Sequence, residues 1–131
     1  MAKGGKTHPP PALHELESEV MEVMWEIGEA NVRTVMDELN RRASKERKYT
    51  TVMTILARLD GKDVLSRRRE GRTDLYTPLF TRDGYLAARA EADVSALVEQ
   101  YGEAALVNFA RKMDQLDPKR RQQLRRLARR D

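Results

Sequence analysis

Apolar side chains recur every three or four positions in three stretches of the first half of the chain, which is the spacing of one helix face. Gly28 and Gly61 follow the first and third stretches, where a glycine readily ends a helix. Asn31 precedes the second stretch, and its side chain is suited to cap a helix N-terminus. The pattern predicts helices over residues 13–28, 32–43 and 50–59. The acidic residues of the first helix are expected to face solvent: Glu15, Glu17, Glu19, Glu22 and Glu26.

Two short β-prone runs come next, over residues 64–69 and 73–79. Glu70-Gly71-Arg72 joins them, and a glycine in a short polar link between such runs predicts a β-hairpin. Helical spacing returns at Thr81, and Asp117-Pro118 is a favoured start for a last helix. The second half therefore predicts helices over residues 81–102, 103–113 and from 118 onward.

This order of elements predicts a mainly α fold in two parts. Three helices followed by a hairpin form a winged helix-turn-helix, whose third helix offers its outer face to the DNA major groove. We therefore expect a winged-helix DNA-binding domain over residues 13–79 and a three-helix dimerisation domain over residues 80–131. Residues 1–12 are rich in proline and glycine and predict a disordered arm, with Lys3 and Lys6 as weak candidates for DNA contact.

Composition narrows the classes of function. The chain of 131 residues holds 25 Lys and Arg against 21 Asp and Glu, and residues 40–72 alone hold eleven basic and four acidic residues. Such a basic block indicates a local polyanion-binding face. Cysteine is absent and both histidines lie near the N-terminus, so no metal site, cofactor or enzymatic centre is expected. Without a long apolar run or a signal-like segment, we expect no membrane insertion and a cytoplasmic location.

The outer face of the predicted third helix carries short hydroxyl side chains and one arginine in place of the usual Glu and Lys. Threonine methyl and hydroxyl groups suit close approach to base edges, and Arg58 suits a bidentate contact with guanine. Basic side chains on the wing suit phosphates, although strand alternation prevents three consecutive arginines from facing DNA together. The candidate DNA-binding residues are Lys48, Tyr49, Thr50, Thr51, Thr54, Arg58, Arg67, Arg68, Arg69 and Arg72.

Simpler roles for some of these residues remain open. Thr51 is also suited to cap the third helix, and consecutive arginines protect an exposed sheet edge from pairing with other chains. Neither role explains why the basic block, the small-residue helix face and the hairpin coincide, so DNA binding is favoured. The flanking residues Arg41, Arg42 and Lys45 are further candidates for contact with the DNA backbone.

The last third of the chain has too much apolar surface for a small monomer. Residues 103–113 are apolar around much of their helical circumference, which indicates a buried interface. We expect a two-fold dimer, and the alternative is that these helices fold back on the first domain. The basic last helix either contacts DNA or remains solvated. The candidate dimerisation residues are Leu97, Val98, Leu106, Val107, Phe109, Leu124 and Leu127.

Several segments, in their order and spacing, resemble the penicillinase and methicillin-resistance repressors of the BlaI/MecI type. Leu16–Trp25 (LESEVMEVMW) resembles the first helix of that family. Further matches run from Tyr49-Thr50-Thr51-Val52 to Arg58-Leu59, and include Glu70-Gly71-Arg72 and Tyr76-Thr77-Pro78. With the C-terminal helices, the resemblance covers roughly residues 13–115.

The resemblance implies a homodimeric repressor that binds double-stranded DNA at a palindromic operator. It also implies a response to β-lactam antibiotics, in which a membrane-bound sensor protease leads to cleavage of the repressor at an Asn-Phe bond in the dimer domain. Asn108-Phe109, within LVNFAR, lies at a comparable place and is the candidate proteolytic switch. Loss of the dimer would greatly weaken binding at two half-sites.

The chain departs from the family pattern after the third helix, where Gly61-Lys62-Asp63 replaces a turn like Lys-Lys-Gly. Asp tolerates the left-handed backbone that such a turn needs. A copper-responsive branch of the family uses a C-terminal cysteine cluster, and the absence of cysteine excludes that mode. The alternatives to a protease-controlled repressor are a winged-helix regulator controlled by a small ligand and an architectural or protein-interaction module.

Overall fold

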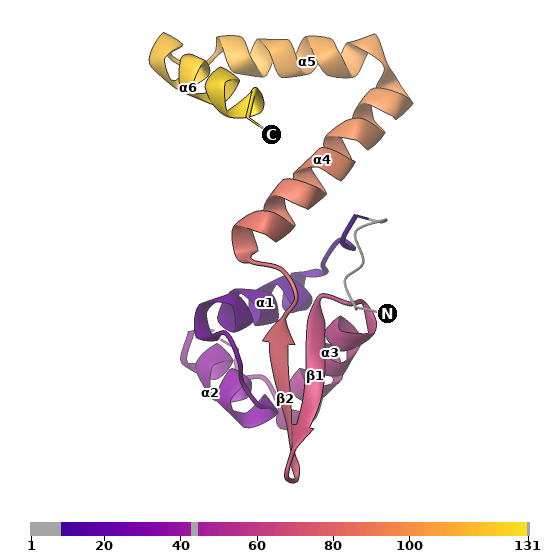
Figure 1. Cartoon of the computed structure of the whole chain (residues 1–131), viewed down its shortest axis with the longest axis vertical. Helices are drawn as coiled ribbons and strands as arrows, with labels where there is room; N and C mark the ends of the chain where they lie inside the picture. Colours follow the sequence, from indigo (N-terminus) through magenta and orange to yellow (C-terminus); the bar gives the residue numbers. More distant parts are fainter. Residues whose placement is uncertain (1–8, 43–44, 131) are drawn as a thin grey trace. The chain divides into compact units, whose positions relative to one another are not determined.

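The structure, a computed structural model, describes residues 9–42 and 45–130. Its elements confirm a mainly α fold with a single antiparallel hairpin between the third and fourth helices of the described chain (Figure 1). The chain divides into two compact units, the first ending at Ala90 and the second beginning at Glu91. The elements are α1 (Glu15–Ile27), α2 (Val32–Arg42), α3 (Tyr49–Gly61), β1 (Leu65–Glu70), β2 (Thr73–Pro78), α4 (Arg82–Tyr101), α5 (Glu103–Asp114) and α6 (Pro118–Ala128).

The core of the first unit lies where the apolar stripes of α1, α2 and α3 meet the base of the hairpin. These stripes bury their side chains because each helix presents one apolar face to the other two. Ile27, the last apolar residue of the predicted α1 stripe, lies outside this core and is exposed. Fully buried side chains include Val20, Met21, Met24, Val35, Val52, Leu56, Leu59, Val64, Leu65 and Tyr76.

One acidic residue of α1 is not at the surface as the sequence predicted. The side chain of Glu17 is 1% exposed, and its Oε1 accepts hydrogen bonds from the backbone N–H of His14 and from Lys62 Nζ, each at 2.8 Å. Burial raises the pKa of Glu17, but these two donors outweigh burial and hold the pKa below its ordinary value. The pair joins the start of α1 to the residue that follows α3.

The two ends of α3 correct one prediction and confirm another. Lys48 is the N-cap residue, and Thr51 lies inside the first turn, so Thr51 does not cap this helix. After α3, Asp63 has φ of +62°, which confirms that aspartate takes the left-handed position of this turn. The Asp63 turn brings Val64 N–H to the Leu59 carbonyl at 3.0 Å and leads directly into β1.

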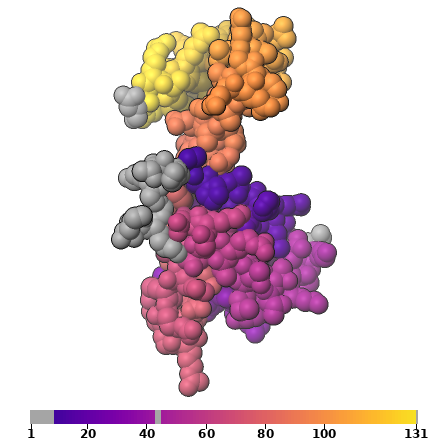
Figure 2. Space-filling view, turned by 90° about the vertical axis from the view of Figure 1, so that its right-hand side faces the viewer, coloured from indigo at the N-terminus to yellow at the C-terminus, as the bar shows by residue number. Residues whose placement is uncertain are grey.

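The hairpin forms the predicted wing. Glu70 pairs with Thr73, so the loop is the two residues Gly71-Arg72, and Gly71 has the positive φ of +62° that such loops require. On its other side β2 is bridged to Ala30 by hydrogen bonds of 2.9 and 3.1 Å with Tyr76, which leaves β1 as the edge strand. The tip of the hairpin protrudes from the surface of the first unit (Figure 2).

The first turns of α4 pack on α1. The indole Nε1 of Trp25 donates to the Phe80 carbonyl at 2.9 Å, and the Trp25 and Tyr85 rings lie 5.4 Å apart. The carbonyls of Pro10 and Pro11 accept hydrogen bonds from Arg89 and from the Tyr85 hydroxyl, so the end of the expected arm is tied to this helix. Lys3 and Lys6 lie outside the described residues.

The second unit holds the rest of α4 with α5 and α6. Asp117 caps α6 by accepting a hydrogen bond from the Arg120 N–H at 2.9 Å, and Pro118 follows it, as predicted. Within this unit Ala105 is buried, whereas most of the larger apolar side chains are exposed, Leu106 by 54% and Leu127 by 52%. Among the described residues, no helix has the length and apolar character needed to cross a membrane.

Candidate nucleic-acid interface

A groove of about 660 Å³ lies between the outer face of α3, the start of α2 and the hairpin. It brings together four of the predicted DNA-binding residues: Tyr49, Thr54, Arg67 and Arg72. Lys48, Thr50, Thr51, Arg58, Arg68 and Arg69 are not part of its lining. The groove therefore joins the predicted recognition helix and wing on one side of the first unit.

The outer face of α3 is built of small or flexible side chains. Thr50, Met53, Thr54, Ala57 and Arg58 are exposed, and Thr51 is half-buried. The Thr54 hydroxyl donates to the Thr50 carbonyl at 2.9 Å, so toward DNA it offers a methyl group and an accepting oxygen, and not a free donor. A surface with so few bulky groups lets the helix backbone come close to base edges.

The three consecutive wing arginines point to different partners. Arg67 lies toward α3, 3.8 Å from Asp60, and a hydrogen bond to Tyr76 raises its pKa. Arg68 lies on the opposite face and pairs with Glu70 at 2.8 Å and with Glu29 at 3.1 Å. These two carboxylates raise the pKa of Arg68.

The third wing arginine, Arg69, pairs across the hairpin with Asp74 at 3.1 Å. The predicted alternation of the three arginines is thus confirmed, because Arg67 and Arg69 share one face of β1 and Arg68 takes the other. All three already hold a carboxylate. Their charge also lies on the edge strand, which fits the simpler role of edge protection.

Three predicted cations are not neutralised in this way. Lys48, Arg58 and Arg72 are exposed, and none of their side chains has a hydrogen bond or ion pair with another described residue. They stand at the start of α3, on its outer face and at the tip of the wing. Phosphates and base edges would therefore not have to displace an internal carboxylate to reach them.

Arg33 is a residue that the sequence analysis missed. It is exposed at the start of α2, lines the groove, and places its guanidinium 5.7 Å from the centre of the Tyr49 ring. A cation over an aromatic face is a favourable contact that holds both side chains in place. The only signal in the sequence was one base in the first turn of a helix within a strongly acidic segment.

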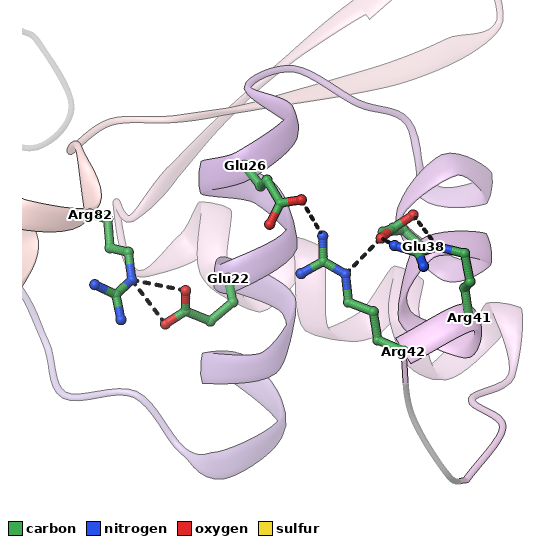
Figure 3. A network of polar contacts seen from close by, with 6 residues as sticks. All are labelled: Glu22, Glu26, Glu38, Arg41, Arg42 and Arg82. Atoms are coloured by element: carbon green, nitrogen blue, oxygen red, sulfur yellow. Dashed lines mark hydrogen bonds and ion pairs between the residues drawn. The ribbon is translucent and has the colours of Figure 1, made fainter.

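Ion pairs within α2 and between α2 and α1 occupy two other candidate cations, Arg41 and Arg42 (Figure 3). Arg41 and Arg42 both bind Glu38, and Arg42 also binds Glu26 at 2.8 Å. Hydrogen bonds from Arg41 and Arg42 lower the pKa of Glu38 to about 2. Arg82 binds Glu22 at 2.9 Å in the same view. Lys45 is exposed.

The candidate dimerisation residues are spread over the three helices of the second unit. Leu97 and Phe109 line an apolar hollow of about 290 Å³ with Tyr101, Ala104, Ala105 and Asn108. Asn108 lies in the middle of α5, where its side-chain amide donates to the Ala104 carbonyl at 2.9 Å. Leu97 and Val107 are each 41% exposed, while Val98 and Leu124 are half-buried.

Comparison with known proteins decides the family. Residues 13–130 match the family described as penicillinase repressor. The chain belongs to the penicillinase repressor family. Over 114 residues it is 38% identical to the transcriptional regulator BlaI of Mycobacterium tuberculosis, covering 83% of this chain and 80% of that protein. It is 28% identical over 99 residues to the penicillinase repressor of Bacillus licheniformis, covering 76% of each.

The first unit also has a counterpart among solved structures. The solution structure of the DNA-binding domain of the repressor BlaI matches with a TM-score of 0.50 and 33% identity, over 58% of this chain and 90% of that one. As a member of the penicillinase repressor family, this chain is a transcriptional repressor and not an enzyme. Among the described residues, no group of three or more His, Asp or Glu is arranged to hold a metal ion.

Proposed function

We propose that the chain is a homodimeric, sequence-specific repressor that binds a palindromic operator in double-stranded DNA. Membership of the penicillinase repressor family supports the role of a DNA-binding repressor. The groove beside α3 supports the proposal that the exposed face of this helix reads the DNA. A repressor of this kind works where the chromosome is, so the proposal includes a cytoplasmic location.

The observation that carries the proposal is the pairing of a small-residue helix face with unneutralised cations. An α-helix fits into the major groove, and exposed Thr50, Thr54 and Ala57 leave room for that approach. Arg58 on the same face is free to make a bidentate contact with guanine. Arg72 at the wing tip is free to bind a phosphate or the adjacent minor groove.

Exposed apolar side chains in the second unit support self-association. Leu106 is 54% exposed, and neighbouring apolar residues on α4 and α5 leave the hollow around Phe109 open. A second copy that covers these side chains removes them from water, which is the main driving force for such interfaces. A two-fold dimer would present two α3 helices to successive major grooves about 34–36 Å apart.

We further propose that repression is relieved when the signal of a membrane-bound β-lactam sensor protease leads to cleavage between Asn108 and Phe109. This bond lies within α5 (Glu103–Asp114), and Phe109 lines the apolar hollow. Proteases cut exposed, locally opened chain, so α5 has to unwind there before the bond is cut. Once α5 is cut, the two copies separate and the advantage of two linked half-sites is lost.

Three substitutions test how the operator is read. Arg58→Ala is expected to weaken binding to the operator by about 1–3 kcal/mol for each half-site and to relax base preference, with a smaller loss on random DNA. Arg72→Ala is expected to weaken binding to both sequences equally and to reduce the salt slope by about 1.8, because the proposed dimer loses one phosphate contact from each copy. Arg68→Ala is the matched control on the wing, because Glu29 and Glu70 already occupy its guanidinium.

Fluorescence anisotropy of labelled duplexes over a series of salt concentrations measures all three variants. An operator selected from a randomised pool and a scrambled duplex of the same length serve as the two ligands. Equal losses on operator and scrambled DNA for Arg58→Ala would overturn the assignment of Arg58 to base readout. If Arg68→Ala weakens DNA binding more than Arg72→Ala does, the assignment of Arg72 as the DNA-contacting cation of the wing is wrong.

A further inference from the structure

The last helix carries the strongest uncompensated charge of the second unit. Residues 118–130 hold seven basic residues and no acidic one. At 100° per residue, one half of α6 and the turn that follows it gathers six of these cations, while Leu124, Leu127 and Ala128 share the other half. We call the six the α6 basic face: Lys119, Arg121, Arg125, Arg126, Arg129 and Arg130.

No carboxylate within the described chain neutralises this face. Arg121 donates to the Leu116 carbonyl at 3.3 Å, and the other five have neither an ion pair nor a hydrogen bond from their side chains to a described residue. The second unit does contain exposed acids, such as Glu99 and Glu103, yet α6 makes no ion pair with them. By contrast, Arg42 on α2 and Arg68 and Arg69 on the wing each hold a carboxylate.

The face is also shaped to receive an anion. Arg121, Arg125, Arg126 and Arg129 line a hollow of about 420 Å³ together with Gln122 and Pro118. All four guanidinium groups offer planar, forked donors that match a phosphate in two hydrogen bonds at once. Five of the six residues of the α6 basic face are arginine, and arginine is the side chain that favours this geometry over a simple point charge.

We propose that the α6 basic face binds the phosphate backbone of double-stranded DNA outside the segment read by α3. The inference rests on the proposed function, because α3 and the wing bring the chain to DNA. A phospholipid surface is the other polyanion to consider. Helices that lie on membranes bury a broad apolar face of Trp, Phe or Leu, whereas the apolar half of α6 has only Leu124, Leu127 and Ala128 and also carries Arg120 and Gln123.

The test uses the full chain with Arg125→Gln and Arg129→Gln together. Both residues line the same hollow, and glutamine removes the charge while it keeps a polar side chain and a similar helix propensity. The matched control changes Arg111 and Lys112 to glutamine, which removes two exposed cations of the neighbouring helix α5. Binding is measured against a duplex that ends at the selected operator and against one extended by about one turn, roughly 10 base pairs, at each end.

On the extended duplex the α6 variant is expected to lower the salt slope by about 3.6, because the proposed dimer loses two arginines from each copy and about 0.9 is lost for each phosphate contact. On the short duplex its slope should equal that of the unmodified chain, and the control variant should match the unmodified chain on both. A variant that binds both duplexes as the unmodified chain does overturns the inference, while Arg72→Ala still tests the proposed function independently.

Other results identify a different partner. Equal slope losses on both duplexes would mean that α6 contacts the operator itself and would overturn the assignment to flanking DNA. Dissociation of the variant into monomers in light scattering would show that α6 binds acidic residues of a second copy. Unchanged DNA binding with lost sedimentation on vesicles of phosphatidylserine and phosphatidylcholine would assign the face to a membrane. If the unmodified chain binds neither duplex, the proposed function itself is wrong.

Discussion

Removing Lys62 should strongly destabilise the first unit, because it leaves a buried carboxylate without its counter-charge. Glu17 has one oxygen that accepts from Lys62 Nζ and from His14 N–H, and its other oxygen, Oε2, is buried without a hydrogen-bond partner in the described structure. Breaking a buried ion pair from one side costs about 3–5 kcal/mol. The Lys62 side chain is 26% exposed, so we expect Lys62→Met to lose about 2–3 kcal/mol.

Trp25, the single tryptophan of the chain, reports this loss specifically for the first unit. Its indole is fixed by the hydrogen bond to the Phe80 carbonyl and by the Tyr85 ring, both within that unit. Urea unfolding followed by Trp25 fluorescence should show the midpoint falling by about 2 M, if m is about 1–1.5 kcal/mol/M for a unit of this size. Lys48→Met, at the exposed other end of α3, is the matched control and should change stability by no more than about 0.5 kcal/mol.

The pH dependence gives the same pair a second signature. In the unmodified chain the pKa of Glu17 is lowered, so the stabilisation is present above its ordinary value of 4.5 and is lost as the pH falls through the folded-state pKa. Without Lys62, burial dominates and raises the pKa of Glu17, so protonation relieves the strain of the variant. The loss of unfolding free energy caused by Lys62→Met should therefore be smaller at pH 4 than at pH 7. At pH 7, adding Glu17→Gln should restore part of the lost stability. A deficit that equals that of Lys48→Met, or that does not change with pH, would refute this reasoning.

Two further predictions follow from the fold. Gly71 has φ of +62°, so Gly71→Ala should lower the free energy of unfolding by about 1–2 kcal/mol in the same urea assay. Gly61 has a helical backbone and open space around it, so Gly61→Ala should raise the free energy of unfolding by up to about 1 kcal/mol. The opposite order would mean that the turn at Gly71 does not demand a left-handed residue. Leu106→Asp should give monomers in light scattering, with Arg111→Asp, at an exposed polar position of the same helix, remaining dimeric. An unchanged dimer for Leu106→Asp would remove Leu106 from the proposed interface.

The periodic elements could be predicted because their signals are local. The stripes of α1 (apart from Ile27), α2 and α3, the caps Asn31 and Asp117, and the glycine turn of the wing appear as predicted. Each depends only on residues within one or two helical turns. For the same reason Asp63 could be assigned to a left-handed turn from its residue type and place in the sequence.

Contacts between distant segments could not be predicted in this way. The sequence predicts Glu17 at the surface because it lies among other glutamates. In the structure Glu17 is buried and accepts a hydrogen bond from Lys62, 45 positions later in the sequence. Arg68 is predicted as a DNA contact, and its place in the sequence gives no sign that Glu29, 39 positions earlier, lies beside it. Arg33 lies in an acidic segment and gains significance only because α2 starts next to the Tyr49 ring.

The most direct test of the central claim is selection from a randomised pool of DNA duplexes. The purified full chain is mixed with the pool at physiological salt, and the retained duplexes are sequenced. The account predicts enrichment of a motif with two-fold symmetry whose half-sites are centred about 10–10.5 base pairs, or a multiple of that, apart. Retention of duplexes without any enriched motif would contradict it, because the exposed face of α3 would then contribute no base readout.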